Sequence, residues 1–261
     1  MYKKRRNYLF GPVSSRRLGA SLGIDLLPYK TCTLDCVYCE CDSTTDLTLC
    51  RKEYVSVHDV LAELEETLRQ GPALDYVTFS GSGEPLLHSG IGEIIDWLKD
   101  HYPHYEVAVL TNGTLLQKQE VRAQLMRADL VIPSLDAATE TLFHEINRPH
   151  NSLNIHDIIS GLVQFRREYR GEICLEVFII PGMNDTLAEL EQMRQVIRSI
   201  KPDRLQVNTL DRAGAEDWVQ PATEEELKKC SNILGGAYKK QEAGDKRQER
   251  PYQSQEWHPD E

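Results

Sequence analysis

The stretch DYVTFSGSGEPLLHSGIGEIIDWLKDHYPHYEVAVLTNG, residues 75–113, decides the fold class. It contains an apolar run at residues 75–80, an amphipathic stretch at residues 89–102 and a second apolar run at residues 105–113. A strand, a helix and a strand in this order form a βαβ unit, whose two strands lie parallel in one sheet with a right-handed crossover. The stretch therefore predicts an α/β fold with a parallel sheet.

The same pattern recurs along most of the chain. Further predicted strands lie at residues 21–27, 128–136, 172–182 and 203–211. Further predicted helices lie at residues 57–71, 117–126, 155–169 and 186–200. Six strands followed by helices predict either an open doubly wound sheet or a complete or partial barrel. In each of these folds ligands bind at the carboxyl ends of the strands, where the polar and glycine-bearing segments of this chain fall.

The composition indicates a globular protein. The chain has 261 residues, of which 40% are hydrophobic, and no apolar run approaches the ~18 residues that span a bilayer. Its start lacks the apolar stretch and cleavage site of a secretory signal, so we expect a cytoplasmic protein without a membrane segment. A net charge of -11 disfavours a broad nucleic-acid-binding surface. Six basic residues near the start are interpreted as a solvated arm, namely Lys3, Lys4, Arg5, Arg6, Arg16 and Arg17.

The repeated pattern weakens towards the end of the chain. We predict a core domain at residues 1–215 and a C-terminal helical extension at residues 216–240, with its helix at about residues 223–238. Residues 241–261 lack core-forming periodicity and are predicted to be a disordered tail.

Four of the seven cysteines lie within TCTLDCVYCEC, residues 31–41. Cys32, Cys36 and Cys39 have C-x3-C-x2-C spacing, and clustered thiols in a reducing compartment are metal ligands or catalytic groups more often than disulfides. Structural zinc and ordinary electron-transfer clusters use four protein ligands, whereas three leave one metal position open for a substrate or cofactor. Cys41 and Cys50 are interpreted as spare thiols.

The segment CTLDCVYC resembles the cysteine signature of the radical S-adenosylmethionine (radical SAM) superfamily, with Tyr38 as the aromatic residue before the last cysteine. The resemblance implies a partial (β/α)6 TIM-like barrel, and it makes residues 1–215 the radical SAM core domain. It also implies that Cys32, Cys36 and Cys39 bind three irons of a [4Fe–4S] cluster while S-adenosylmethionine (SAM) chelates the fourth. The implied activity is reductive cleavage of SAM to a 5′-deoxyadenosyl radical, which abstracts hydrogen from a substrate.

A second motif carries the resemblance further. The GSGEP segment is similar to the Gly-Gly-Glu-Pro loop that holds the SAM amino group in this family, with a serine inserted between the glycines. The resemblance therefore implies a SAM-binding loop made of Gly81, Ser82, Gly83, Glu84 and Pro85.

Polar groups after later strands are further candidates for binding SAM. Ser134 and Asp136 alternate at a strand end, so both side chains face one side and could contact the ribose. Asn112 could contact SAM or act in a turn. Met183 is a candidate for the adenine site, and Arg148 could pair with the SAM carboxylate or form an exposed salt bridge.

Within the superfamily, the segment at residues 11–41 is most similar to an iron–sulfur oxidoreductase branch related to tRNA wyosine-synthesis and molybdenum-cofactor biosynthesis enzymes. The resemblance implies a low-potential electron donor, flavodoxin or ferredoxin. With no large C-terminal domain to close the barrel, we expect a macromolecular substrate, and the acidic charge favours protein over tRNA. The alternative function is a non-catalytic zinc or iron–sulfur binding module, with Cys41 as a possible fourth zinc ligand.

Overall fold

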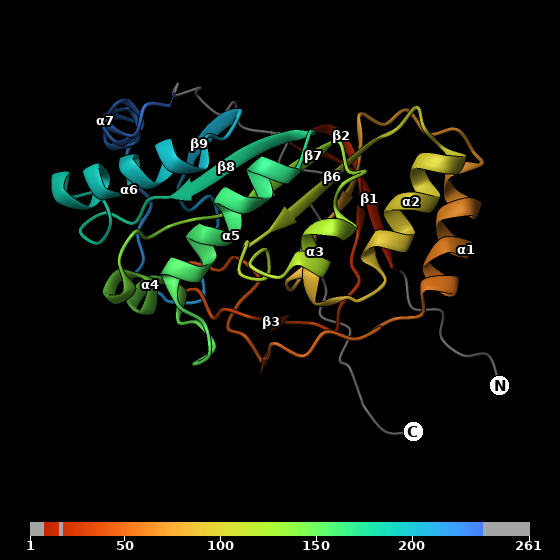
Figure 1. Cartoon of the computed structure of the whole chain (residues 1–261), viewed down its shortest axis with the longest axis horizontal. Coiled ribbons are helices and arrows are strands. Elements are labelled where there is room, and N and C mark those ends of the chain that lie inside the picture. Colours follow the sequence, from red (N-terminus) through yellow and green to blue (C-terminus); the bar gives the residue numbers. More distant parts are fainter. Residues whose placement is uncertain (1–7, 16–17, 237–261) are drawn as a thin grey trace.

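The computed structural model describes residues 8–15 and 18–236, which build one curved sheet covered by helices on its outer side (Figure 1). The sheet has seven strands in the order β1-β2-β5-β6-β7-β8-β9. Its strands are β1 (Leu9–Ser15), β2 (Gly19–Ile24), β5 (Tyr76–Phe79), β6 (Glu106–Thr111), β7 (Leu130–Pro133), β8 (Glu172–Phe178) and β9 (Arg204–Asn208).

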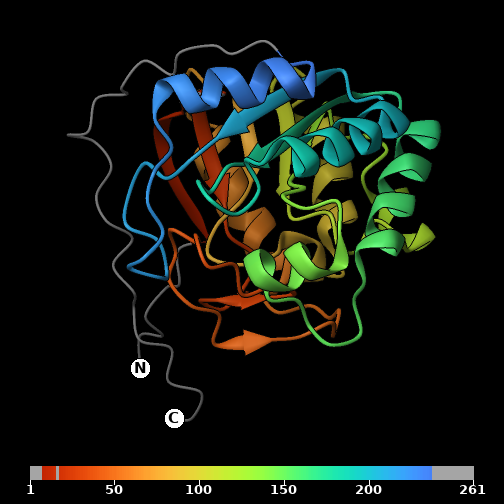
Figure 2. The ribbon, with the colours of Figure 1, turned by 90° about the vertical axis from the view of Figure 1, so that its left-hand side faces the viewer.

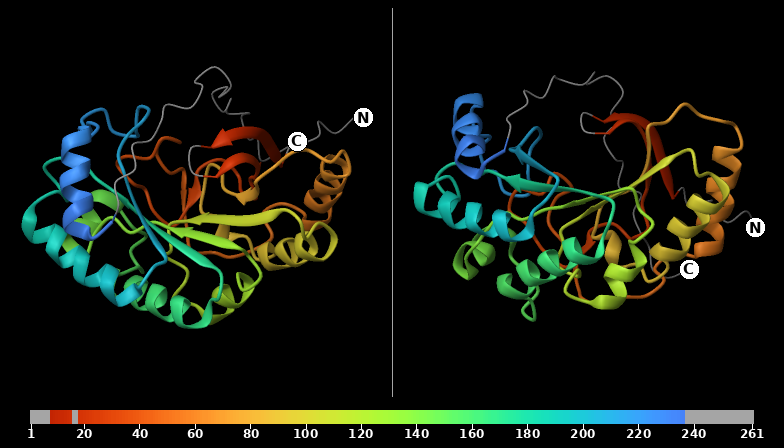
Figure 3. Two further views of the ribbon diagram at one scale, coloured as in Figure 1. Left: turned by 90° about the horizontal axis from the view of Figure 1, so that it is seen from above. Right: turned by 45° about the horizontal axis from the view of Figure 1, so that its top comes forward.

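The pairing of these strands confirms the predicted partial (β/α)6 barrel. From β2 to β9 neighbouring strands are parallel and follow one another in chain order, as in the pairs Ile24↔Phe79 and Val177↔Val207. β1 lies antiparallel to β2 at one edge, and β9 forms the other edge. Figure 3 shows the helices in an arc around the convex side of the sheet.

Several helices begin at a residue whose side chain caps the first turn. The hydroxyl of Ser56 caps α1 (Val57–Leu68), and Thr223 forms a capping box with Glu226 at the start of α7 (Glu224–Leu234). The other helices are α2 (Ile91–His101), α3 (Gln119–Gln124), α4 (Glu140–Asn147), α5 (Ile155–Glu168) and α6 (Leu187–Ile200), with the short 3-10 helix η1 (Pro85–Leu87).

Side chains alternate between the two faces of the sheet and so divide the apolar residues into two groups. On the outer face Val77, Val109 and Val131 belong to the main core that the helices cover. Ala108, Ile132 and other residues form a smaller separate cluster. Apolar side chains fill both faces of the sheet near the start of the strands. A binding site is therefore expected at the carboxyl ends of the strands, where the polar groups lie.

Six predicted strands and six predicted helices occur where the periodicity placed them, but the sequence analysis missed several elements. The missed ones are β1, α4 and the short parallel pair β3 (Thr31–Cys32) and β4 (Asp46–Leu47). The last helix, predicted to reach residue 238, ends at Leu234 because Gly235 adopts a left-handed φ of 87°. Leu227 and Leu234 of this helix belong to the main core, and the division of the chain at residue 215 stays a prediction.

The predicted basic arm and the predicted disordered tail at residues 241–261 lie outside the described residues. Among the residues that are described, no helix combines the length and the apolar character that crossing a membrane requires.

Candidate functional site

The three cysteines of the C-x3-C-x2-C motif lie on one loop at the carboxyl end of the sheet. Cys32 ends β3, and Cys36 and Cys39 follow in the connection to β4. Figure 2 shows these two short strands apart from the main sheet, at one end of it. All three cysteines are half-buried, and all seven cysteines of the chain are free thiols.

The end of α4 fixes the backbone around Cys36. The N–H of Val37 donates to the carbonyl of Ile146 at 2.9 Å, and the N–H of Asp35 donates to the carbonyl of Asn147 at 3.0 Å. The last carbonyls of a helix have no partner inside the helix. The cysteine loop supplies those partners, so its position depends on α4.

Each of the three sulfurs has a nitrogen donor within hydrogen-bonding distance. The Asn112 amide is 3.5 Å from Cys32 Sγ, and the Asn147 amide is 3.3 Å from Cys36 Sγ. The sulfur of Cys39 accepts from the Lys30 ammonium at 3.0 Å. Such donors stabilise negative charge on sulfur, which both thiolates and iron–sulfur clusters carry.

The three thiols differ in acidity. Burial raises the pKa of Cys32 to about 12, and the nearby Glu84 carboxylate adds to the rise. Burial also raises the pKa of Cys36 well above its ordinary value. A hydrogen bond from Cys41, together with the Lys30 ammonium, lowers the pKa of Cys39 to about 5 despite its burial. Cys41 and Lys30 therefore both favour the thiolate form of Cys39.

The glycine loop that follows β5 packs directly against the cysteine loop. The N–H of Glu84 donates to the carbonyl of Thr31 at 3.1 Å. A Cβ atom on Gly83 would lie 2.1 Å from that carbonyl oxygen, so only glycine allows this approach. The buried Ser82 donates its hydroxyl to Asp25 at 3.1 Å, and Pro85 begins the 3-10 helix. Gly81, with a φ of 151°, is exposed.

The carboxylate of Glu84 lies buried at the centre of this contact. One oxygen accepts from the Thr111 hydroxyl at 2.6 Å and the Leu86 N–H at 3.0 Å, and the other from the Asn112 N–H at 2.7 Å. Burial raises the pKa of Glu84 to about 7, although these three donors oppose the rise. A carboxylate has about four acceptor sites, so this group retains capacity for a further donor.

Asp136 connects the cysteine loop to β7 and β8. One of its oxygens accepts from the Tyr38 hydroxyl at 2.6 Å and the Asn147 amide at 2.8 Å, and the other from the Phe178 N–H at 2.9 Å. The Tyr38 ring stacks on the Phe178 ring with 3.9 Å between centroids. Burial raises the pKa of Asp136, against the effect of its hydrogen bonds.

A cavity of about 50 Å³ lies between the cysteine loop, the end of β7 and α5. Its polar lining comprises Tyr38, Asn112, Ser134, Asp136 and Asn147, and its apolar lining comprises Leu34, Leu135, Phe143, Ile155 and Ile158. Small-molecule sites usually enclose at least ~300 Å³. This cavity therefore accommodates only a fragment of a nucleoside-sized ligand.

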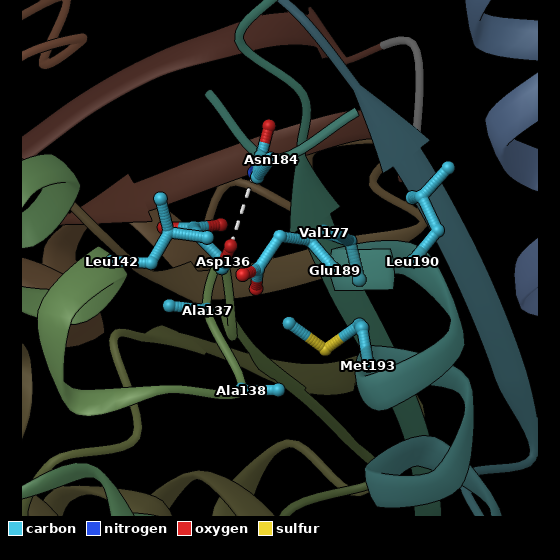
Figure 4. Close-up of a pocket in the computed structure, with 9 residues that line it drawn as sticks. All are labelled: Asp136, Ala137, Ala138, Leu142, Val177, Asn184, Glu189, Leu190 and Met193. Carbon is cyan, nitrogen blue, oxygen red and sulfur yellow. Dashed lines mark hydrogen bonds between the residues drawn. The ribbon is translucent and has the colours of Figure 1, made fainter. Parts of the chain in front are cut away.

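A smaller pocket of about 10 Å³ lies on the other side of Asp136, towards α6 (Figure 4). Asn184 lines this pocket, and its side-chain amide donates to the backbone carbonyl of Asp136 at 3.0 Å. Ala137 and Met193 contribute apolar lining. A space of this size holds at most about one water molecule. The residues that line this pocket therefore pack behind Asp136 and support its position.

Four of the residues that the sequence analysis proposed line this cavity, namely Tyr38, Asn112, Ser134 and Asp136, whereas Arg148, Met183 and the glycine loop do not. Arg148 pairs with Glu216 at 2.5 Å and is exposed. Met183 is half-buried in the turn after β8 and packs against the main core. The roles of Arg148 and Met183 in SAM binding stay predictions, as do those of the other proposed residues.

Two residues of the site were missed by the sequence analysis. Asn147 belongs to the unpredicted helix α4, and its contact with Cys36 joins residues far apart in the chain. Lys30 lies two positions before Cys32, and an isolated lysine beside a cysteine motif is the only signal for it. In the described ranges no group of three His, Cys, Asp or Glu side chains is arranged around a single metal ion, whereas in the cluster that the resemblance implies each cysteine would bind a different iron.

The model of the Radical SAM superfamily matches residues 26–232. The chain therefore belongs to the radical SAM superfamily, which confirms the family and the class of enzyme predicted from the sequence. It is 34% identical over 227 residues to a UPF0026 protein of Methanocaldococcus jannaschii, a match that spans 86% of this chain and 70% of that protein.

Other similar proteins differ in length or share only the fold. A Brachyspira hyodysenteriae protein named GTPase Obg is 40% identical over 232 residues, and the match spans 89% of this chain but 34% of that protein. A GTP 3′,8-cyclase of Limosilactobacillus fermentum is 28% identical over 159 residues, which are 59% of this chain and 44% of that protein. A structure of TYW1 with a lysine-pyruvate adduct superposes with a TM-score of 0.58 at 15% identity, covering 82% of this chain and 72% of that one.

Proposed function

We propose that Cys32, Cys36 and Cys39 hold a [4Fe–4S] cluster and that the adjoining glycine loop and cavity bind SAM. The observation that carries the proposal is the set of three half-buried thiols on one loop, each with its own nitrogen donor. When bound, the cluster and SAM supply reductive cleavage of SAM to a 5′-deoxyadenosyl radical that abstracts hydrogen from a substrate.

The residues of the chain have separate tasks in this proposal. Glu84 accepts a hydrogen bond from the SAM ammonium with its remaining acceptor site, and the carbonyls of Gly81 and Ser82 accept from its other protons. Asn112 and Ser134 provide polar contacts beside the cavity. Asp136 holds Tyr38 and Asn147 in position, and thereby keeps the cysteine loop in place.

Anaerobic reconstitution with iron and sulfide tests the proposal. We expect about four irons per chain, as a [4Fe–4S] cluster requires, and 5′-deoxyadenosine from SAM after reduction. Cys36→Ala should lose both, whereas Cys50→Ala, which changes an exposed thiol, should retain both. Zinc in place of iron, or no SAM cleavage with a strong reductant, would instead support the non-catalytic metal-binding module.

We further propose a protein substrate and an external electron donor, flavodoxin or ferredoxin. The net charge of -11 supports protein over RNA. Trp218 is 51% exposed. Its segment is joined to the cysteine loop by a hydrogen bond from the Glu216 N–H to the Val37 carbonyl. Aromatic residues are enriched at protein interfaces, so Trp218 is a candidate contact for a protein substrate.

Fractions of a host lysate test the choice of substrate. We expect the protein fraction to increase 5′-deoxyadenosine formation above the uncoupled rate, and Trp218→Ala to reduce this increase. Stimulation by the tRNA fraction or by the low-mass fraction alone would contradict a protein substrate. Reduced flavodoxin or ferredoxin should replace the chemical reductant in the same assay.

A further inference from the structure

Lys30 places a buried positive charge against the cysteine motif. The side chain is only 2% exposed, and its ammonium nitrogen lies 3.0 Å from the sulfur of Cys39. Lys30 follows the strand β2 and has a left-handed φ of 55°. A buried ammonium is costly unless an opposite charge lies close to it. The position of Lys30 therefore requires a negative partner.

The negative partner of Lys30 is sulfur. Within residues 8–15 and 18–236, Lys30 makes no ion pair with a carboxylate, and its ammonium donates to the sulfur of Cys39 at 3.0 Å. The backbone carbonyl of Lys30 has a different task, because it accepts from the N–H groups of Thr45 and Asp46. The side chain can thus be changed without removing those bonds.

Lys30 differs from the other two sulfur donors. Cys32 and Cys36 face the neutral amides of Asn112 and Asn147, whereas Cys39 faces a cation. A hydrogen bond from a charged donor is about twice as strong as a neutral one. Because buried charges interact through a low effective dielectric, the charge of Lys30 would act on a bound cluster and not on the sulfur of Cys39 alone.

We propose that Lys30 raises the reduction potential of the cluster by stabilising its reduced state, an inference that rests on the proposed cluster. Reduction transfers one electron from an external low-potential donor to the cluster, which leaves the donor oxidised and adds one negative charge beside the ammonium. Hydrogen bonds to the sulfurs and nearby charge are known determinants of cluster potential. In this proposal Lys30 places a positive charge beside the cluster and does not contact the reacting atoms.

Two substitutions of Lys30 separate the effect of its charge from the effect of its packing. Lys30→Met keeps the length of the side chain and removes the charge, while Lys30→Arg keeps the charge. Lys52→Met is the matched control, because Lys52 is an exposed lysine that lies over the Tyr54 ring at 4.8 Å. Solvent and salt screen its charge from the cluster.

A potentiometric titration followed by electron paramagnetic resonance measures the effect on each reconstituted full-length chain. At the wild-type midpoint, Lys30→Met should lower the ratio of reduced to oxidised cluster about tenfold, which corresponds to a midpoint about 59 mV more negative. Lys30→Arg should stay near the wild type, and Lys52→Met should match it.

The outcomes distinguish the two proposals. A wild-type chain that binds no cluster contradicts the proposed function itself. A Lys30→Met chain with full iron content and an unchanged midpoint overturns the inference about Lys30 alone. If Lys30→Met and Lys30→Gln both lose the cluster while Lys30→Arg retains it, the charge holds the cluster in place and the inference about its potential is wrong.

Discussion

The side-chain amide of Asn147 lies 3.3 Å from the sulfur of Cys36, although 111 positions separate the two residues in the chain. The same amide donates to Asp136 at 2.8 Å, so one buried group joins a cysteine to the carboxylate at the end of β7. The last carbonyls of α4 meanwhile accept from the backbone of the cysteine loop. Asn147 therefore fixes the position of the cysteine motif relative to α4 and the end of β7.

Replacing Asn147 by alanine should weaken metal binding. The change removes a donor from Cys36 and from Asp136, and the loss of such a supporting group typically costs 10–100-fold in metal affinity. The free energy of unfolding should fall by about 1–3 kcal/mol, because a buried acceptor loses a partner. Iron retained after exposure to a chelator and urea unfolding measure the two effects. Asn151→Ala, at an exposed turn, should change neither.

The elements that bring Asn147 and Cys36 together show how far the sequence determines the fold. Parallel strands such as β5 and β7 are buried on both faces, so they form continuous apolar runs between turns and were predicted. The connection between β7 and β8 contains two helices, and the βα pattern predicted only α5, so α4 was missed. β1 was missed because Gly11 and Pro12 interrupt it and it lies at a sheet edge.

The residues of the candidate site could be predicted where they form a local motif or follow a predicted strand, as Asn112, Ser134 and Asp136 do. Cys32, Cys36 and Cys39 form a local spacing, as do the residues around Glu84, and both motifs are visible without a structure. Asn147 contacts sulfur through tertiary structure, for which no local pattern exists, and the position of Lys30 beside the cysteine motif does not show which sulfur it contacts. The ion pair between Arg148 and Glu216 could not be predicted either, because Glu216 lies in a segment after β9 that only the fold brings close to Arg148.

The carboxyl group of Glu84 should make the stability of the metal-free chain depend on pH. Burial raises its pKa from 4.5 to about 7, so the folded state favours the protonated form. The resulting stabilisation is fully present below about pH 4.5 and is lost as the pH rises through about 7, roughly 3 kcal/mol in total. In Glu84→Gln this part of the pH dependence should vanish. Urea unfolding at about pH 5 and about pH 8 measures it.

Two comparisons make that result specific to Glu84. Glu93→Gln changes an exposed carboxylate of α2 and should keep the pH dependence of the wild type. A Glu84→Gln chain that loses stability between the two pH values as much as the wild type does would show that other groups cause the effect.

Gly83→Ala should disturb the contact between the glycine loop and the cysteine loop. The new Cβ would lie 2.1 Å from the Thr31 carbonyl oxygen, and a backbone atom of β3 cannot move without shifting Cys32. We expect a loss of about 1–3 kcal/mol in unfolding free energy, as for other overpacked sites, together with lower iron content. Gly71→Ala is the control, since its Cβ meets nothing within 4 Å. With a φ of 66°, it should cost about 1 kcal/mol and leave iron content unchanged.

Tyr38 contributes to the site through two separable contacts, a hydroxyl bonded to Asp136 at 2.6 Å and a ring stacked on Phe178. Tyr38→Phe removes only the first. Because hydrogen bonds to charged groups contribute about 1.5–3 kcal/mol, the unfolding free energy should fall by about that amount while iron content stays at the wild-type level. Tyr38→Leu also removes the stacking, and should cost about 0.5–1.5 kcal/mol more and release iron.

The pH dependence of the Tyr38→Phe effect identifies Asp136 as the partner. Burial raises the pKa of Asp136, and the Tyr38 hydroxyl opposes that rise by stabilising the ionised form. Without the hydroxyl the pKa rises further, so the cost of Tyr38→Phe is largest at high pH, where Asp136 is ionised, and shrinks as the pH falls and the carboxyl group becomes protonated. Thermal unfolding of both chains over a pH series measures this difference. An equal cost at every pH would mean that the hydroxyl does not act through the Asp136 carboxylate.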